Sequence, residues 1–286
     1  LRVHDEFFNE TYVTTVSFQP ETGSGLAVCL RCLDASTWLR STYHERYPAV
    51  FFSATLSPIE YFSTMICRED PGGGGAERLL LASPFPPENL FVGTVPSLSL
   101  RYRDRAATLA GVADVLVEAL AARRGNYLLF FPSFAYLRAC LGEMRRIARD
   151  RGLGKEIEWH VQDTAMSDSL RESYLARFNC FGGATLAACA VLGGVFAEGI
   201  DLVGECLSGV MIVGVGLPQV CPEREILRDY FQMVRGAGFD FAYRFPGFNK
   251  VTQAAGRVIR SETDRGFILL IDERYDLPDY RSLFPE

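Results

Sequence analysis

Hydrophobic and polar positions change period several times along the first part of the chain. Residues 11–18 alternate and are rich in β-branched side chains, residues 26–33 are mostly apolar, and a turn with two glycines separates them. Two such runs around a turn predict a β-hairpin. Residues 105–123 instead carry apolar side chains three and four positions apart, which predicts an amphipathic helix.

Short apolar runs alternate with helical patterns over the rest of the chain. The apolar runs predict strands at residues 49–52, 127–131, 157–161, 185–191, 209–215 and 266–271. The helical patterns predict helices at residues 36–43, 133–151, 167–179, 223–235 and 250–259, and one that ends near residue 67. Continuous apolar strands separated by such helices are typical of a parallel sheet covered on both faces. We therefore predict an α/β fold with a doubly wound, mostly parallel sheet, preceded by the hairpin.

The composition excludes several classes of protein. The chain has 286 residues, of which 48% are hydrophobic and 22% are charged, as expected of a folded globular protein. The apolar run at residues 184–197 ends at Glu198, short of the roughly 20 residues that a membrane-spanning helix needs. The N-terminus has no basic region followed by an apolar one, so we predict neither a signal peptide nor a membrane partner. Because the chain begins with Leu1, we expect a fragment.

Charge and cysteine content narrow the partners and the compartment. The net charge of −6 argues against coating nucleic acid through bulk positive charge, so any nucleic-acid site must be local. The eight cysteines lie mostly in apolar stretches, where a free thiol behaves as a small hydrophobe. Cys29 and Cys32 have no second pair at ligand spacing, so no metal site is predicted. We expect a cytoplasmic protein, and the preference for Arg over Lys favours a bacterial one.

The loops that follow the strands are where chemistry is expected, because ligands of open parallel sheets bind beyond the carboxyl ends of the strands. Four segments are assigned to those loops: residues 53–55, 132–133, 198–201 and 253–260. The last segment is the most informative, because it concentrates two arginines and an amide.

On a continuous helix, Gln253, Arg257 and Arg260 fall on one face. Two guanidiniums in that arrangement would bind a triphosphate through paired hydrogen bonds. Alternatively, Glu262 or Asp264 pairs them in a solvated surface network. The spacing alone leaves both interpretations open.

The same segment resembles a known family. Residues 253–260, Gln-Ala-Ala-Gly-Arg-Val-Ile-Arg, and the residues after them up to 275 closely resemble the last helicase motif of the XPD/DinG group of superfamily 2 helicases. Three further segments are similar to motifs of this group and come in the expected order: Ser-Ala-Thr-Leu-Ser-Pro at 53–58, Phe-Phe-Pro-Ser at 130–133 and Gly-Val-Phe-Ala-Glu-Gly-Ile-Asp-Leu at 194–202. The resemblance spans nearly the whole chain.

The resemblance covers one motor domain of the two that such helicases have. The sequence contains no Gly-x-x-x-x-Gly-Lys-Ser/Thr phosphate loop and no Asp-Glu-Ala-His-type segment, which belong to the first motor domain. The resemblance thus implies a RecA-like C-terminal motor domain of a 5′ to 3′ ATP-dependent DNA helicase. It implies a hairpin and connecting segment at residues 1–48, packed on a motor domain at residues 49–286.

The resemblance also implies ligands and partners. ATP and Mg²⁺ would be bound jointly with the first motor domain of the same polypeptide, and single-stranded DNA would be the nucleic-acid partner. The resemblance leaves open whether the full-length protein contains an iron–sulfur cluster, and no such cluster is expected in this chain. The alternative is an ATPase-dead nucleic-acid-binding or protein-interaction module on the same fold.

The site roles that the resemblance implies fall into three sets. Arg257 and Arg260 would reach the γ-phosphate as arginine fingers, with Gln253 sensing the nucleotide from the same side. The residues that would couple the nucleotide to DNA are Glu198, Gly199, Asp201 and Gly256. The residues that would contact the DNA backbone are Ser53, Thr55, Ser133 and Arg138. An acidic turn is the alternative for residues 198–201, and a helix N-cap is the alternative for Ser53 and Thr55.

Overall fold

The computed structural model describes residues 8–19, 25–44, 49–67, 77–179, 183–194, 196 and 207–284. The chain divides into two compact units, Leu1–Leu80 with Val220–Phe245 and Leu81–Gln219 with Pro246–Glu286. Each unit has its own set of packed elements. The domain division between residues 48 and 49 stays a prediction.

The first unit begins with the predicted hairpin. Strands β1 (Tyr12–Gln19) and β2 (Gly25–Cys32) pair antiparallel, with Val16 opposite Val28. Among the residues that the structure describes, the helical elements of this unit are α2 (Ser36–His44), α3 (Ile59–Cys67), α7 (Pro222–Arg235) and a π-helical turn at Asp240–Arg244.

Aromatic and polar contacts connect the distant segments of this unit. The ring of Tyr61 on α3 lies 5.2 Å from the rings of both Phe241 and Phe245, measured between centroids. Arg31 of β2 pairs with Glu223 of α7 at 3.2 Å. The hairpin, α3 and α7 therefore pack as one unit.

One predicted strand in this unit is wrong. Residues 49–52 form no strand, and the side chains of Val50 and Phe52 are 85% and 88% exposed. A strand needs a neighbour that offers backbone partners, and no described strand pairs with these residues. A run of four apolar residues is too short to identify a strand by itself.

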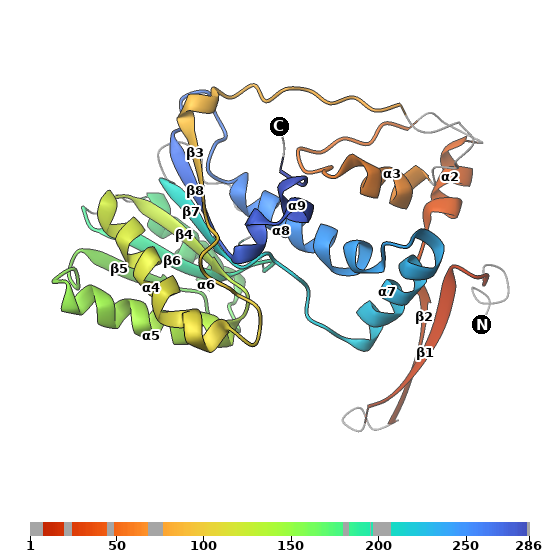
Figure 1. The fold of residues 1–286 in the computed structure, drawn as a ribbon, viewed down its shortest axis with the longest axis horizontal. Helices are drawn as coiled ribbons and strands as arrows, with labels where there is room; N and C mark the ends of the chain where they lie inside the picture. The colour runs from red at the N-terminus through yellow and green to blue at the C-terminus, as the bar shows by residue number, and fades with distance from the viewer. Residues whose placement is uncertain are drawn as a thin grey trace. The chain divides into compact units, whose positions relative to one another are not determined.

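The second unit is built on six parallel strands in the order β3-β8-β7-β4-β6-β5 (Figure 1). Along the chain they are β3 (Leu90–Val95), β4 (Asn126–Phe131), β5 (Ile157–Val161), β6 (Thr185–Val191), β7 (Gly209–Val213) and β8 (Gly266–Ile271). All but β3 coincide with predicted strands. β3 lies at the edge of the sheet and leaves Phe91 67% exposed, so it lacks the pattern of a buried strand.

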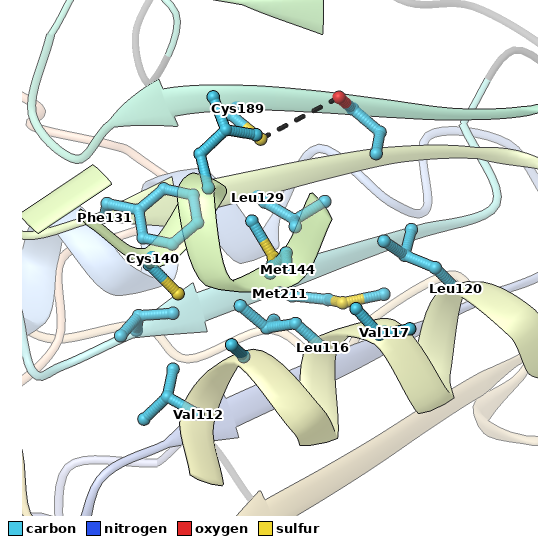
Figure 2. Packing of buried hydrophobic residues seen from close by; sticks show 14 of the residues in the cluster. Val112, Leu116, Val117, Leu120, Leu129, Phe131, Cys140, Met144, Cys189 and Met211 are labelled. Atoms are coloured by element: carbon cyan, nitrogen blue, oxygen red, sulfur yellow. Dashed lines mark hydrogen bonds between the residues drawn. The ribbon is translucent and has the colours of Figure 1, made fainter. Parts of the chain in front are cut away.

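Helices cover both faces of this sheet. On one face, α4 (Arg105–Ala122) and α5 (Phe134–Asp150) bury a core with β4 that includes Leu116, Met144 and Phe131 (Figure 2). Trp159 of β5 packs against that core, so its neighbour His160 points to the opposite face. There His160 stacks on Tyr174 of α6 (Asp168–Ala176), with ring centroids 4.1 Å apart. The predicted α/β fold is confirmed.

The remaining elements of the second unit are short, apart from α8. They are α8 (Phe245–Ala255), α9 (Pro278–Arg281) and 3₁₀ turns at Pro87–Asn89, Arg177–Asn179 and Glu273–Asp276. Within the described part of the chain, no helix combines the length and apolar character needed to cross a membrane.

Candidate nucleotide and nucleic-acid sites

The helix that was expected to carry the arginine segment ends early. α8 stops at Ala255, and the backbone N–H groups of Arg257 and Val258 then donate to the carbonyls of Ala254 and Ala255 in tighter turns. Gln253 is therefore helical, but Arg257 and Arg260 lie beyond the helix. The prediction that the three share one helical face is wrong. Gly256, which follows the last helical residue, has a low helix propensity and accounts for the break.

The arginine segment also lies at the other edge of the sheet from the one predicted. A Cβ on Gly266, the first residue of β8, would come within 2.5 Å of Val258 Cγ1 and 2.9 Å of the Ser208 carbonyl oxygen, just before β7. Asn89, just before β3, donates from Nδ2 to the Glu262 carbonyl at 2.9 Å. These neighbours all stand at the amino ends of strands, so the segment lies at the amino edge.

The direction of α8 explains this position. A Cβ on Gly247, near the start of α8, would lie 3.0 Å from the carbonyl oxygen of Val215, just past the carboxyl end of β7. α8 therefore runs from the carboxyl edge toward the amino edge, as a crossover helix between parallel strands must. A segment that leads from such a helix into a strand belongs to the amino edge.

Two buried side chains fix the arginine segment. Val258, between the two arginines, is 3% exposed. The carboxylate of Asp264, 9% exposed, accepts the backbone N–H groups of Arg260 and Ser261 on one oxygen, each at 2.8 Å. The Val258 side chain and the Asp264 carboxylate therefore hold the backbone on both sides of Arg260.

The same contacts set the electrostatics of the segment. Burial alone would raise the pKa of Asp264, but the N–H groups of Arg260 and Ser261 and the Arg260 charge outweigh it and lower the pKa. Burial lowers the pKa of Arg260, and the Asp264 charge acts against that shift. As whole residues, Arg257 and Arg260 are half-buried. Asp264 is thus a buried acceptor of backbone N–H groups, and its charge also acts on the Arg260 guanidinium.

Ser133 stands at the opposite, carboxyl edge. It follows β4 and caps α5, and its Oγ accepts the backbone N–H of Tyr136 at 3.2 Å, which confirms the expected helix start. Arg138 is exposed on the same helix, near the same end. Contact of either side chain with DNA stays a prediction.

Ser53 and Thr55 belong to the first unit. Ser53 Oγ accepts the backbone N–H of Thr55 at 3.2 Å and lies 3.2 Å from its hydroxyl. α3 begins at Ile59, beyond both residues, so neither caps it. They form a polar turn before the helix.

The expected coupling residues Glu198, Gly199 and Asp201 lie outside the described residues. The strand before them ends in a tight turn, where a Cβ on Gly193 would meet Lys250 Cδ at 2.8 Å. Lys250 of α8 therefore packs against the turn at Gly193.

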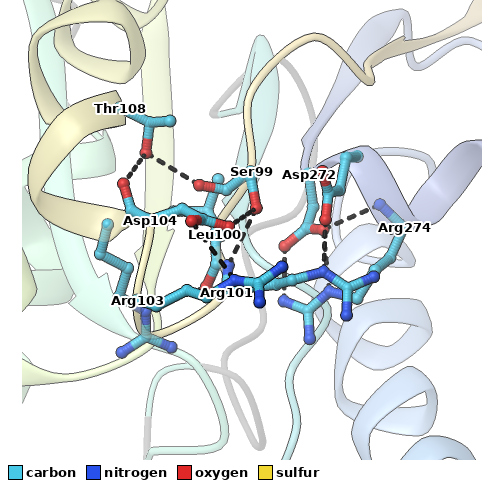
Figure 3. Close-up of polar contacts among 10 residues, drawn as sticks. Ser99, Leu100, Arg101, Arg103, Asp104, Thr108, Asp272 and Arg274 are labelled. Carbon is cyan, nitrogen blue, oxygen red and sulfur yellow. Dashed lines mark hydrogen bonds and ion pairs between the residues drawn. The ribbon is translucent and has the colours of Figure 1, made fainter.

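An arginine-rich loop at the carboxyl edge was missed altogether. Arg101, Tyr102 and Arg103, between β3 and α4, line a shallow, open depression together with Arg274, which follows β8. Figure 3 shows three of these residues, Arg101, Arg103 and Arg274. Arg274 is held by the fully buried Asp272 through bonds of 2.9 and 2.6 Å. Burial alone would lower the pKa of Arg274, but the bonds to Asp272 raise it. The signal in the sequence was the Arg-Tyr-Arg run itself.

Residues 116–286 match the helicase C-terminal domain family. The chain belongs to the XPD/DinG helicase C-terminal domain family. A probable ATP-dependent helicase of Methanocaldococcus jannaschii is 31% identical over 281 residues, covering 94% of this chain and 40% of that protein. The helicase subunit XPD of general transcription and DNA repair factor IIH from Schizosaccharomyces pombe is 24% identical, covering 89% and 34%. The ATP-dependent DNA helicase DinG of Photobacterium profundum is 28% identical, covering 85% and 32%.

This helicase C-terminal domain spans about two fifths or less of the length of these relatives. A solved XPD helicase matches it with a TM-score of 0.66 at 20% identity, covering 90% of this chain and 44% of that chain. Xpd4 of S. tokodaii matches with a TM-score of 0.59 at 15% identity, covering 88% and 45%. At these identities the two solved structures show the fold, which is RecA-like.

The described residues of the helicase C-terminal domain offer no group of three or more His, Cys, Asp or Glu side chains that could hold a metal ion. Cys29 and Cys32 are exposed free thiols on the hairpin. Neither Mg²⁺ nor an iron–sulfur cluster is therefore assigned ligands from the described part of this domain. The guanidiniums of Arg257 and Arg260, in contrast, have the chemistry of phosphate ligands.

Proposed function

We propose that this chain is the second motor domain of an ATP-dependent DNA helicase and that Arg257 and Arg260 reach the γ-phosphate of ATP held by a first motor domain. The observation that carries the proposal is the anchored segment at the amino edge. Buried Val258 and the Asp264 carboxylate fix its backbone, while Arg257 and Arg260 are each only half-buried as whole residues.

Guanidiniums suit this role for physical reasons. The transferring phosphoryl group develops charge on its oxygens, and fixed donors aimed at that charge stabilise the transition state. Arginine stays protonated and offers planar, paired donors. Gln253, in the last turn of α8, would orient the same phosphate region. Mg²⁺ and the β-phosphate would be held by the first motor domain, and Glu198, Gly199, Asp201 and Gly256 would couple the nucleotide to DNA.

We assign single-stranded DNA to the carboxyl edge. The positive end of the α5 helix dipole favours an anion, and a motor that moves along any sequence must contact phosphates and not base edges. Ser133 and Arg138 stand at that helix start. Ser53 and Thr55, which belong to the first unit, would also contact the DNA backbone.

The test of the ATP role is mutation of the full-length protein. Arg257→Ala and Arg260→Ala should each lower DNA-stimulated ATPase activity by about 10³- to 10⁵-fold, the range for arginine fingers. Lysine should not rescue either position, because an ammonium lacks the planar pair of donors. Arg265→Ala is the matched control, because Arg265 is exposed on the same loop. Retained ATPase with a strongly lowered melting temperature would show a structural role and refute the proposal.

A second experiment uses the isolated chain. We expect no ATP hydrolysis, because the sequence has no phosphate loop. Turnover stimulated by DNA in the isolated chain would contradict the shared ATP site. A full-length protein that binds single-stranded DNA and never hydrolyses ATP would support the ATPase-dead alternative.

A further inference from the structure

The arginine loop at the carboxyl edge is held in one conformation. Ser99 Oγ donates to Asp104 Oδ2 at 2.7 Å, and Thr108 Oγ1 donates to the Ser99 carbonyl at 2.8 Å (Figure 3). Leu100 is fully buried in the core. The backbone N–H of Glu273, after β8, donates to the Leu98 carbonyl at 2.9 Å and ties the loop to the neighbouring strand. The next three residues therefore form a fixed tip.

That tip presents an aromatic ring to solvent. Tyr102 is 89% exposed, although its neighbour Leu100 is fully buried. The guanidinium carbon of Arg105 lies 5.9 Å from the Tyr102 ring centroid and 5.8 Å from that of Tyr136. The Arg105 side chain is anchored by a bond from Nε to the Leu100 carbonyl at 3.1 Å. The ring is thus supported by a positioned cation while most of its surface stays open.

The charges around the tip are nearly balanced. The arginines are Arg101, Arg103, Arg105 and Arg274, and the carboxylates are Asp104, Asp272 and Glu273. Arg101 pairs with Glu273, and Arg274 pairs with Asp272. Arg103 is different, because its side chain is 81% exposed and meets Asp104 at 3.5 Å, a surface pair worth about 0–1 kcal/mol. Stacking on the aromatic ring, with one accessible cation beside it, is therefore the dominant binding chemistry here.

The tip also adjoins the helix start assigned to DNA. Arg105 lies over Tyr136, and the backbone N–H of Tyr136 donates to Ser133 Oγ. An aromatic ring beside a cation is the combination by which proteins bind single strands without reading sequence, because every base has a face that can stack.

We propose that Tyr102 stacks on a base of single-stranded DNA and that Arg103 contacts the adjacent phosphate. The inference rests on the proposed function and adds a second contact, beyond Ser133, along the same edge of the sheet. Arg101 keeps its bond to Glu273 and orients the loop.

The test measures binding of full-length protein to a fluorescent oligothymidylate and to an abasic strand of the same length. Tyr102→Ala should weaken binding to oligothymidylate by about 5- to 150-fold, the range for loss of one stacked base. The same variant should bind the abasic strand as wild type does, because that strand offers nothing to stack. Tyr102→Phe keeps the ring and should bind both strands normally.

A second set of variants tests the phosphate contact by comparing two exposed arginines. Arg103→Ala should lower the salt dependence of binding by about one phosphate contact, whereas Arg124→Ala should leave it unchanged. Arg124 is a suitable control because its side chain is 65% exposed and lies before β4, at the other edge of the sheet.

The outcomes separate this inference from the proposed function. If wild-type protein binds single-stranded DNA and Tyr102→Ala binds it with the same affinity, the stacking site alone is overturned. The same holds if Tyr102→Ala loses as much affinity for the abasic strand as for oligothymidylate. Absence of single-strand binding by wild-type protein overturns both proposals. Melting temperatures equal to that of wild type are expected for the Tyr102 variants, because the side chain is exposed.

Discussion

Asp264 gives the sharpest test of how the arginine segment is held. Its carboxylate accepts two backbone N–H groups, from Arg260 and Ser261, each at 2.8 Å. A hydrogen bond to a charged group contributes about 1.5–3 kcal/mol net, and both bonds are partly accessible to water, which favours the low end. Asp264→Ala should therefore cost about 3 kcal/mol. Asp264→Asn keeps a neutral oxygen acceptor and should cost about half of that.

Hydrogen exchange measures this loss where it occurs. In Asp264→Ala, the amides of Arg260 and Ser261 should exchange far faster than in wild type, with Asp264→Asn intermediate, while β8 keeps its protection. ATPase activity of the full-length variant should fall as well, because Arg260 would lose its position. Thr263→Ala is the control, because Thr263 is exposed and bonds only to the Ser261 hydroxyl.

The pH dependence supplies a second measurement. Because the folded-state pKa of Asp264 is lowered, its contribution to stability is present above the unfolded pKa and is lost as pH falls through the folded one. The stability difference between wild type and Asp264→Asn should be constant from about pH 7 to 5 and should narrow below about pH 4. Unchanged amide protection in Asp264→Ala would refute the reasoning that the carboxylate holds the segment.

Three further predictions concern the second unit. Gly216→Ala should strongly lower the melting temperature, because φ of Gly216 is +70° and a Cβ would lie 2.4 Å from the Gly247 carbonyl oxygen. Gly152→Ala is the control, because φ of Gly152 is +77° and its Cβ would meet no atom within 4 Å. The difference between the two variants measures the steric clash apart from the backbone strain. Ser133→Ala should cost about 1 kcal/mol in denaturant titrations, because α5 loses its N-cap. Burial and then the Arg177 charge lower the pKa of His160, so the folded state favours neutral imidazole and wild type should lose stability as pH falls below about 6.5. His160→Phe should flatten that dependence, and an identical pH profile would contradict it.

Local patterns were sufficient for the centre of the sheet. β4, β6 and β7 are apolar except for Asn126 and Thr185 at the strand starts, and they are fully buried or nearly so, which leaves one interpretation. The start of α5 at Ser133 could also be predicted from the sequence, because an N-cap depends only on residues within one helical turn.

Tertiary contacts decided what the sequence could not. Val251, Ala254 and Val258 are all buried and follow the helical period across Gly256, so the pattern predicts a longer α8 than the structure has. Val258 reaches the core from outside the helix because Gly266 makes room for it. The edge to which the arginines belong was predictable, in contrast, because residues 253–260 lead from a predicted helix to a predicted parallel strand, and a crossover helix must return to the amino edge. The Arg-Tyr-Arg tip depends on the pairing of β3 with β8, two strands far apart in the sequence.

Strand β8 connects the two edges of the sheet that carry the proposed ATP and DNA contacts. Asp264 and the arginine segment precede Gly266, whereas Asp272 and Arg274 follow Ile271. At about 3.3 Å per residue, the six residues of β8 span about 20 Å. A nucleotide bound at one end of the strand and DNA bound at the other would therefore not touch each other. Because β3 and β7 are hydrogen-bonded along both sides of β8, the strand can neither stretch nor bend alone. A ligand that displaced the arginine segment together with β8 would therefore also displace β3 and β7, which are paired with that strand.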